Sequence, residues 1–64
     1  MKRLELLKHV LAHGCVVLRE GGNHTALLNP ANRKQTVLGR HREIDDLMAK
    51  IICRQLEIPP VKQR

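Results

Sequence analysis

The amino-acid sequence predicts a small α+β domain whose elements follow the order α-β-β-β-α. Three observations lead to this prediction. Apolar residues recur at helical spacing near both ends of the chain, short β-branched segments lie between them, and turn-forming Gly, Pro and Asn separate those segments. We expect the three segments to form an antiparallel sheet with both helices packed on one of its faces.

The first helix is predicted over residues 2–13, where apolar side chains recur every three or four residues. These residues are Leu4, Leu6, Leu7, Val10 and Leu11. Gly14 follows directly and favours a helix end at that point, because glycine readily adopts the left-handed conformation of a helix C-terminus.

Three short strands are predicted in the middle of the chain. Residues 15–19 are apolar and β-branched, and the turn-forming pair Gly21 and Gly22 follows them. Residues 25–28 form the second strand. The next four residues, 29–32, contain Asn and Pro in a pattern typical of a turn, and residues 35–38 resume an extended pattern. A three-stranded meander is therefore expected.

The second helix is predicted over residues 44–56, where the apolar pattern is the most regular in the chain. Its apolar residues, all assigned to the core, are Ile44, Leu47, Met48, Ile51, Ile52 and Leu56. Asp45 and Asp46 favour its first turn electrostatically. Pro59 and Pro60 are expected to end it, which leaves residues 59–64 as a flexible tail.

A chain of 64 residues fits a single domain, 1–64, with a small core. Its two cysteines, Cys15 and Cys53, are too few and too far apart for a disulfide framework, and no stretch resembles a signal peptide. No apolar run approaches the roughly 20 residues of a membrane-spanning helix. We therefore expect a cytoplasmic protein without a membrane segment.

The charge of the chain points to an anionic partner. Twelve Lys and Arg against six Asp and Glu give a net charge of +6, and the isoelectric point is near 10.2. Nucleic acid is the first candidate, followed by an acidic protein or an anionic lipid, although a basic surface is also typical of a merely solvated face. The chain has no Phe, Tyr or Trp, so contact with RNA would use phosphates, 2′-hydroxyls and shape rather than stacking on aromatic rings.

The turn before the second strand carries the most informative chemistry. Gly21 and Gly22 allow close backbone approach, so N–H groups there could cradle a phosphate. Antiparallel counting places His24 across from residues 39–41, so that His24 and His41 share one end of the sheet. Cleavage of RNA without a metal needs a base for the 2′-hydroxyl and an acid for the leaving oxygen, and imidazole serves either purpose near neutral pH.

Basic residues near this turn could hold a phosphate and offset its developing charge, namely Arg19, Arg40 and Arg42. The plainer interpretation is that the glycine pair forms an ordinary hairpin turn and that His24 is an exposed strand residue. His9 and His13 lie at i and i+4 on one helix face, but no adjacent cysteine or carboxylate set completes a tetrahedral metal site. We expect neither a metal nor a cofactor.

Several separated motifs resemble those of HicA-type toxins, the messenger-RNA interferases of type II toxin-antitoxin systems. Members of that family have an amphipathic helix, a Gly, a short strand, an Arg before a Gly-Ser-His-like turn, a basic hairpin, a Pro-x-His-like stretch and a final helix. The matching positions here are residues 4–11, Gly14, residues 16–18, Arg19, Gly22-Asn23-His24, Arg33-Lys34, Gly39-Arg40-His41 and residues 44–56. Asn23 stands where the family usually has Ser, and Gly39 where it often has Pro.

The resemblance implies a fold like that of double-stranded-RNA-binding domains and a ribosome-independent, metal-independent endoribonuclease. It also implies that His24 is the catalytic histidine and that a HicB-type antitoxin covers this site. The expected RNA-binding residues are Arg19, Gly22, Asn23, Arg33, Lys34, Arg40 and Arg42, with His41 as a candidate second proton-transfer group. Two alternatives remain: a non-catalytic basic RNA-binding module, and an interaction protein whose basic face docks an acidic protein.

Overall fold

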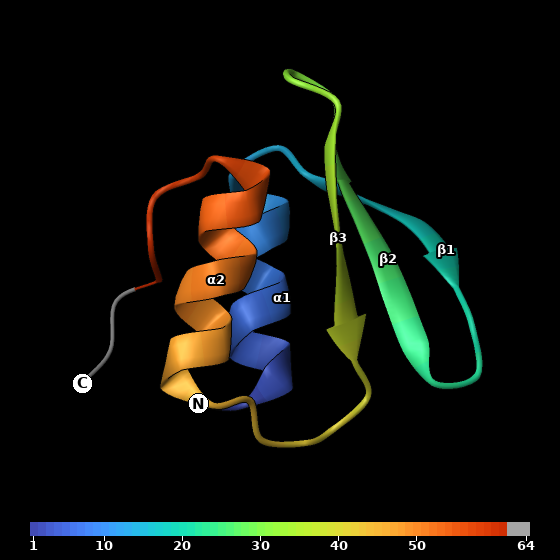
Figure 1. Cartoon of the computed structure of the whole chain (residues 1–64), viewed down its shortest axis with the longest axis vertical. Helices are drawn as coiled ribbons and strands as arrows, with labels where there is room; N and C mark the ends of the chain where they lie inside the picture. Colours follow the sequence, from blue (N-terminus) through green and yellow to red (C-terminus); the bar gives the residue numbers. More distant parts are fainter. Residues whose placement is uncertain (62–64) are drawn as a thin grey trace.

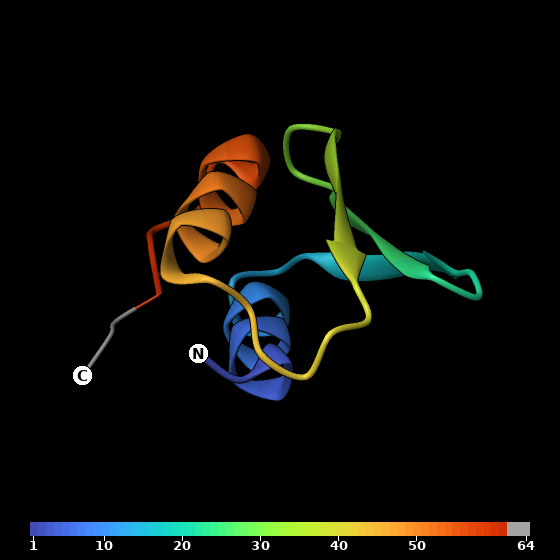
Figure 2. The same ribbon diagram turned by 60° about the horizontal axis from the view of Figure 1, so that its bottom comes forward.

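The computed structural model describes residues 1–61 and has the predicted α-β-β-β-α order (Figure 1). The elements are α1 (Arg3–Ala12), β1 (Val16–Glu20), β2 (His24–Asn29), β3 (Lys34–Gly39) and α2 (Asp46–Leu56). The strands form one antiparallel sheet in the order β1-β2-β3. Both helices lie on the same side of this twisted sheet (Figures 1 and 2), so its other side, here called the open face, is not covered by either helix.

The start of α2 differs from the prediction, because residues 43 and 44 are used in backbone contacts with the beginning of the chain. The N–H of Ile44 donates to the carbonyl oxygen of Met1 at 2.7 Å, and Lys2 pairs with Glu43 in an isolated antiparallel β-bridge. These contacts hold the chain extended, so the helix begins only at Asp46. Ile44 remains a buried core residue, although it lies outside the helix.

The end of α2 at Leu56 agrees with the predicted range, although a local backbone motif rather than the two prolines produces it. Glu57 adopts the left-handed conformation, with φ 57° and ψ 43°. Its N–H donates to the Arg54 carbonyl at 3.1 Å, and the N–H of Ile58 donates to the Cys53 carbonyl at 3.0 Å. This pair of bonds is a Schellman motif, which ends a helix by satisfying its last carbonyl groups. The helix therefore stops at Leu56, before Pro59.

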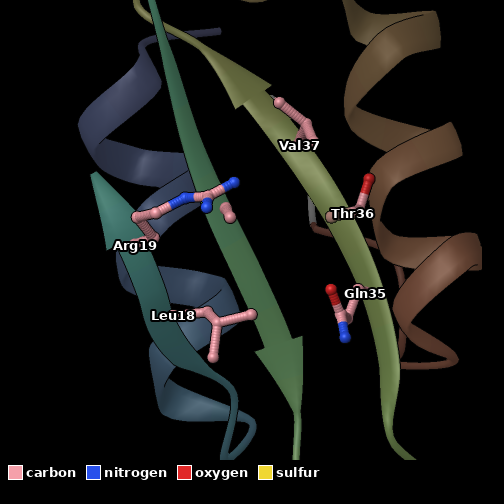
Figure 3. A pocket seen from close by; sticks show the side chains of 6 residues that line it. Leu18, Arg19, Gln35, Thr36 and Val37 are labelled. Atoms are coloured by element: carbon pink, nitrogen blue, oxygen red, sulfur yellow. The ribbon is translucent and has the colours of Figure 1, made fainter. Parts of the chain in front are cut away.

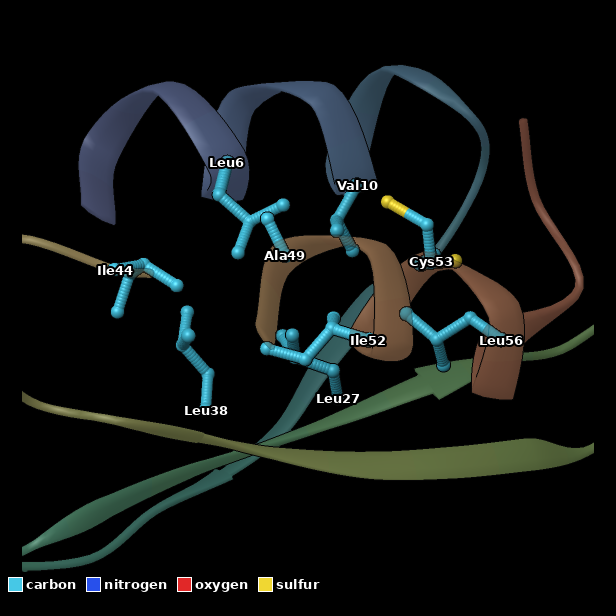
Figure 4. Close-up of a cluster of buried hydrophobic side chains, with 10 residues drawn as sticks. Leu6, Val10, Leu27, Leu38, Ile44, Ala49, Ile52, Cys53 and Leu56 are labelled. Carbon is cyan, nitrogen blue, oxygen red and sulfur yellow. The ribbon is translucent and has the colours of Figure 1, made fainter. Parts of the chain in front are cut away.

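The core lies between the two helices and the sheet (Figure 4). Its buried apolar residues are Leu6, Val10, Cys15, Leu27, Leu38, Ile44, Ala49, Ile52, Cys53 and Leu56. Two of these, Ala49 and Cys53, are small residues on the side of α2 that faces α1 (Figure 4).

The prediction that the whole apolar stripe of α2 is core was wrong. Leu47, Met48 and Ile51 are exposed, by 64%, 48% and 38% respectively. The buried stripe begins instead at Ala49, which the apolar spacing did not include, and it continues at i+3, i+4 and i+7. A three-stranded sheet and one short helix cover only one side of α2, so its second apolar flank stays in contact with solvent.

The last described residues are fastened to α1, although the sequence predicts a flexible tail from residue 59. The Nε2 atom of His9 lies 2.7 Å from the carbonyl oxygen of Pro59, which is hydrogen-bonding distance, and Val61 packs partly buried against the core. The remaining tail residues, 62–64, lie outside the described residues. Within residues 1–61, no helix combines the length and the apolar character needed to cross a membrane.

Candidate functional site

A β-bulge in β1 determines which side chains reach the open face. The pairing of β1 with β2 shifts by one residue between Val17 and Arg19, so that Leu18 is an extra residue and Arg19 is the partner of Ala26. Paired residues on neighbouring strands point to the same side of a sheet, and Arg19 therefore shares the open face with Ala26. Without the bulge, Leu18 would occupy that place and Arg19 would point toward the helices.

The predicted catalytic histidine lines a shallow hollow on this face. The hollow has a volume of about 440 Å³, and its lining residues, which define the open-face hollow, are Arg19, Gly21, His24, Ala26 and Val37. A second depression adjoins it along β2 and β3, and there the Arg19 side chain extends across β2 (Figure 3). Neither the Arg19 nor the His24 side chain has a hydrogen-bond or ion-pair partner among residues 1–61, so both are available to a ligand.

His41 lies at the same end of the sheet as His24. His24 pairs with Gly39 across the β2–β3 hairpin, which agrees with the antiparallel counting from the sequence. A Cβ atom placed on Gly39 would lie 3.4 Å from Cδ2 of His41, so the His41 imidazole rests against the glycine backbone. The structure thus brings the two histidines to one strand end, with Gly39 between them.

The turn next to His24 is closed by its own backbone. The N–H of Gly21 donates to the carbonyl oxygen of His24 at 2.8 Å, and the three turn residues 21–23 are all exposed. Nothing lies within 4 Å of a Cβ atom placed on Gly22. Gly22 and Asn23, both predicted to contact RNA, therefore lie at an open tip beside the histidine.

A hydrogen-bond network supports this strand end from the helical side. The Thr25 hydroxyl donates to Oε1 of Glu20 at 2.9 Å and accepts a bond of 2.7 Å from Nη2 of Arg3, whose Nε donates to the Gly39 carbonyl at 3.1 Å. The other carboxylate oxygen of Glu20 pairs with Arg40 at 3.1 Å. Sequence reasoning missed Arg3 and Glu20, because no local pattern marks their contacts with distant residues.

Arg33 and Lys34 lie far from the histidines. Lys34 pairs with Asn29 at the opposite end of the β2–β3 hairpin, five residues from Gly39, which is roughly 16 Å along a strand. The Nζ atom of Lys34 lies 3.8 Å from the Glu57 carboxylate. Any contact of these two residues with RNA would therefore involve a different part of the molecule from the open-face hollow.

A second, basic hollow lies at the histidine end of the sheet, beside the start of α1. It has a volume of about 520 Å³, and its lining residues, which define the basic hollow, are Lys2, Arg3, Leu4, Arg40, Arg42 and Glu43. The sequence predicted an RNA-binding role for Arg40 and Arg42, but it did not place the first residues of the chain beside them. The β-bridge between Lys2 and Glu43 accounts for this proximity.

The other residues considered for chemistry have structural surroundings. Cys15 and Cys53 are free and buried, and this burial raises the pKa of each thiol; the nearby Cys53 raises the pKa of Cys15 further. The rings of His9 and His13 lie with centroids 4.5 Å apart. The described part of the chain contains no group of three or more His, Cys, Asp or Glu residues that could hold a metal ion.

The structure thus places Arg19 and His24 in one hollow, with His41 and Arg40 at the same strand end, and it separates Arg33 and Lys34 from them. Comparisons with protein-family models, with curated proteins and with solved structures found no match to this chain.

Proposed function

We propose that this protein is a HicA-type toxin, an endoribonuclease that cleaves messenger RNA independently of the ribosome, with His24 as a catalytic residue. The observation that carries the proposal is the open-face hollow, which is lined by an exposed imidazole, His24, and an exposed guanidinium, Arg19, neither of which has a partner among the described residues. His41 at the same strand end and the net charge of +6 add support.

The proposed reaction is an internal transfer of the RNA phosphate. One histidine removes the proton of the 2′-hydroxyl, and the 2′-oxygen attacks the phosphorus while the bond from phosphorus to the 5′-oxygen breaks. The other histidine protonates the departing 5′-oxygen. The Arg19 guanidinium binds the non-bridging oxygens and offsets the negative charge that develops on them. His24 and His41 supply the two proton-transfer groups, and no metal takes part in the proposal.

The proposal includes control by a HicB-type antitoxin that covers the open face. Two large exposed apolar side chains support a protein partner there: Val37, which lines the open-face hollow, is 53% exposed, and Leu18, which lines the adjoining depression, is 51% exposed. A partner that buried these side chains would gain hydrophobic contact and would at the same time exclude RNA from the hollow.

The experiment that tests this function compares the unmutated chain with His24→Ala, induced to equal levels in a bacterial host. Messenger-RNA integrity and growth are followed together, and His13→Ala, which removes an exposed histidine from the region after α1, is the matched control. We expect growth arrest and RNA loss with the unmutated chain and the control only. Growth arrest by His24→Ala as well, or no growth arrest by a folded unmutated chain, would rule out the proposal that His24 is catalytic.

A non-catalytic RNA-binding module is the second candidate, and one observation favours it. The His24 imidazole has no hydrogen-bond partner among residues 1–61, whereas a catalytic imidazole is usually oriented by a partner on its second nitrogen. Under this alternative, the purified protein binds RNA and leaves it intact, and His24→Ala changes affinity only. Anisotropy and a denaturing gel run on the same sample separate the two functions.

A further inference from the structure

The basic hollow contains two cations that the fold itself does not use. Arg40 pairs with Glu20, and Arg3 donates to Thr25 and Gly39. In contrast, the side chains of Lys2 and Arg42 have no hydrogen-bond or ion-pair partner among residues 1–61, and both residues are exposed. Among residues 1–61, Lys2 and Arg42 are therefore two unpaired positive charges that line one concave site.

Backbone contacts bring these two residues to one hollow. The N–H of Arg3 donates to the Arg42 carbonyl at 2.8 Å, and Lys2 pairs with Glu43 in the β-bridge. The main chains of Lys2 and Arg42 are thus held close together, and both residues line the basic hollow. Because the backbone at Lys2 and Arg42 is already fixed before a ligand arrives, binding would need little further ordering of the backbone.

The charges that line the hollow favour an anion. Four cationic side chains face one carboxylate, that of Glu43, which is 71% exposed and lies 3.7 Å from the Met1 nitrogen. A lysine ammonium and an arginine guanidinium are the groups that bind phosphate in proteins, the first as a point charge and the second through its planar fork. The chemistry of the hollow fits a phosphate group.

We propose that the basic hollow binds a backbone phosphate of the RNA strand that flanks the phosphate cleaved at His24, within a few nucleotides of it. This inference rests on the proposed RNA-binding function and deepens it, because it assigns Lys2 and Arg42 to the path of the substrate. Gly39 connects the two sites: it pairs with His24 on one side and accepts a hydrogen bond from Arg3, a residue of the basic hollow, on the other.

The chain span between the two hollows suits a flanking phosphate of the same RNA strand. Gly39 is directly opposite His24, and the three residues from Gly39 to Arg42 span at most about 10 Å. A strand bound on the open face would therefore run over the end of β3 and meet the basic hollow within a few nucleotides. Lys2 and Arg42 act there as substrate-positioning residues that hold the flanking strand.

The test is a binding measurement in the His24→Ala background, which prevents cleavage of the probe. A short labelled RNA is titrated at several salt concentrations with Lys2→Gln/Arg42→Gln and with a matched control, Lys8→Gln/Lys50→Gln. The control removes two exposed lysines that do not line the hollow. We expect Lys2→Gln/Arg42→Gln, here called the hollow variant, to bind roughly tenfold more weakly than its parent. The slope of log affinity against log salt concentration should also become shallower by about 1. The control should change binding far less.

A second measurement in the chain that retains His24 tests the position of the site. Cleavage of a dinucleotide, which carries only the scissile phosphate, is compared with cleavage of a longer RNA. Loss of the flanking contact should lower kcat/KM of the hollow variant more for the longer RNA than for the dinucleotide. Thermal unfolding confirms that the variants remain folded.

The outcomes distinguish this inference from the proposed function. Equal weakening by both double variants, or binding by the hollow variant as tight as that of its parent, would overturn the basic hollow as a phosphate site while RNA cleavage by the unmutated chain still stood. An unmutated chain that neither bound nor cleaved RNA would overturn the proposed function and this inference together.

Discussion

Arg3 donates a hydrogen bond of 2.7 Å from Nη2 to Oγ1 of Thr25 and so joins α1 to the central strand of the sheet. Thr25 is fully buried, and its hydroxyl donates in turn to Glu20. Thr25→Val replaces this hydroxyl by a methyl group and keeps the shape of the side chain, so Arg3 and Glu20 each lose one hydrogen bond.

We expect Thr25→Val to lower the free energy of unfolding by about 1–3 kcal/mol, measured by urea denaturation. Thr25→Ser keeps the hydroxyl and removes only a methyl group, so comparison of the two separates the hydrogen bonds from packing. A valine variant at least as stable as the parent would show that the network does not contribute to stability.

Removal of the second histidine tests its assigned role. We expect His41→Ala to lower the rate of RNA cleavage by about 10²-fold or more, because a positioned acid or base contributes about that much. His41 is exposed, so the midpoint of the unfolding transition should not change when it is replaced. Cleavage by His41→Ala at the parent rate would eliminate His41 from the mechanism.

The left-handed residue after α2 offers a stabilising substitution. Glu57 has φ 57°, a conformation that costs a residue with a Cβ atom about 1 kcal/mol or more relative to glycine. We expect Glu57→Gly to raise the free energy of unfolding by up to about 1 kcal/mol, because the exposed pair with Lys34 contributes little. Glu57→Ala, which retains the Cβ atom, should give no such gain in the same thermal or urea unfolding experiment.

The buried thiols predict a loss of stability at alkaline pH. Burial raises the pKa of Cys15 and of Cys53 above the value of 9.0 that an exposed thiol has. Between that value and the raised pKa, the unfolded chain has released protons that the folded chain retains, so the free energy of unfolding falls as pH rises through this window. Below pH 9 both thiols are protonated in the folded and in the unfolded chain, so they cause no such loss of stability.

Urea unfolding across that alkaline range measures the effect. In Cys15→Ala/Cys53→Ala the slope of stability against pH should be smaller, although the absolute stability is also lower because two core side chains are truncated. Identical slopes in the two proteins would assign the alkaline loss to other groups.

The sequence by itself determined the order of the elements and the position of His24 opposite residues 39–41, within which the structure pairs it with Gly39. Both depend on local information: apolar spacing distinguishes helices from strands, and the β2–β3 turn joins strands that are neighbours in the chain. The candidate site was predictable to that extent, with His24 and His41 at one strand end.

Only the tertiary structure decided which side chains share a surface. The bulge at Leu18 is a one-residue register shift, and it places Arg19 on the open face, where it lines the same hollow as His24. The bridge between Lys2 and Glu43 joins residues that are 41 positions apart and creates the basic hollow. No local pattern encodes either feature, because each depends on the free energy of contacts between segments that meet only after the chain has folded.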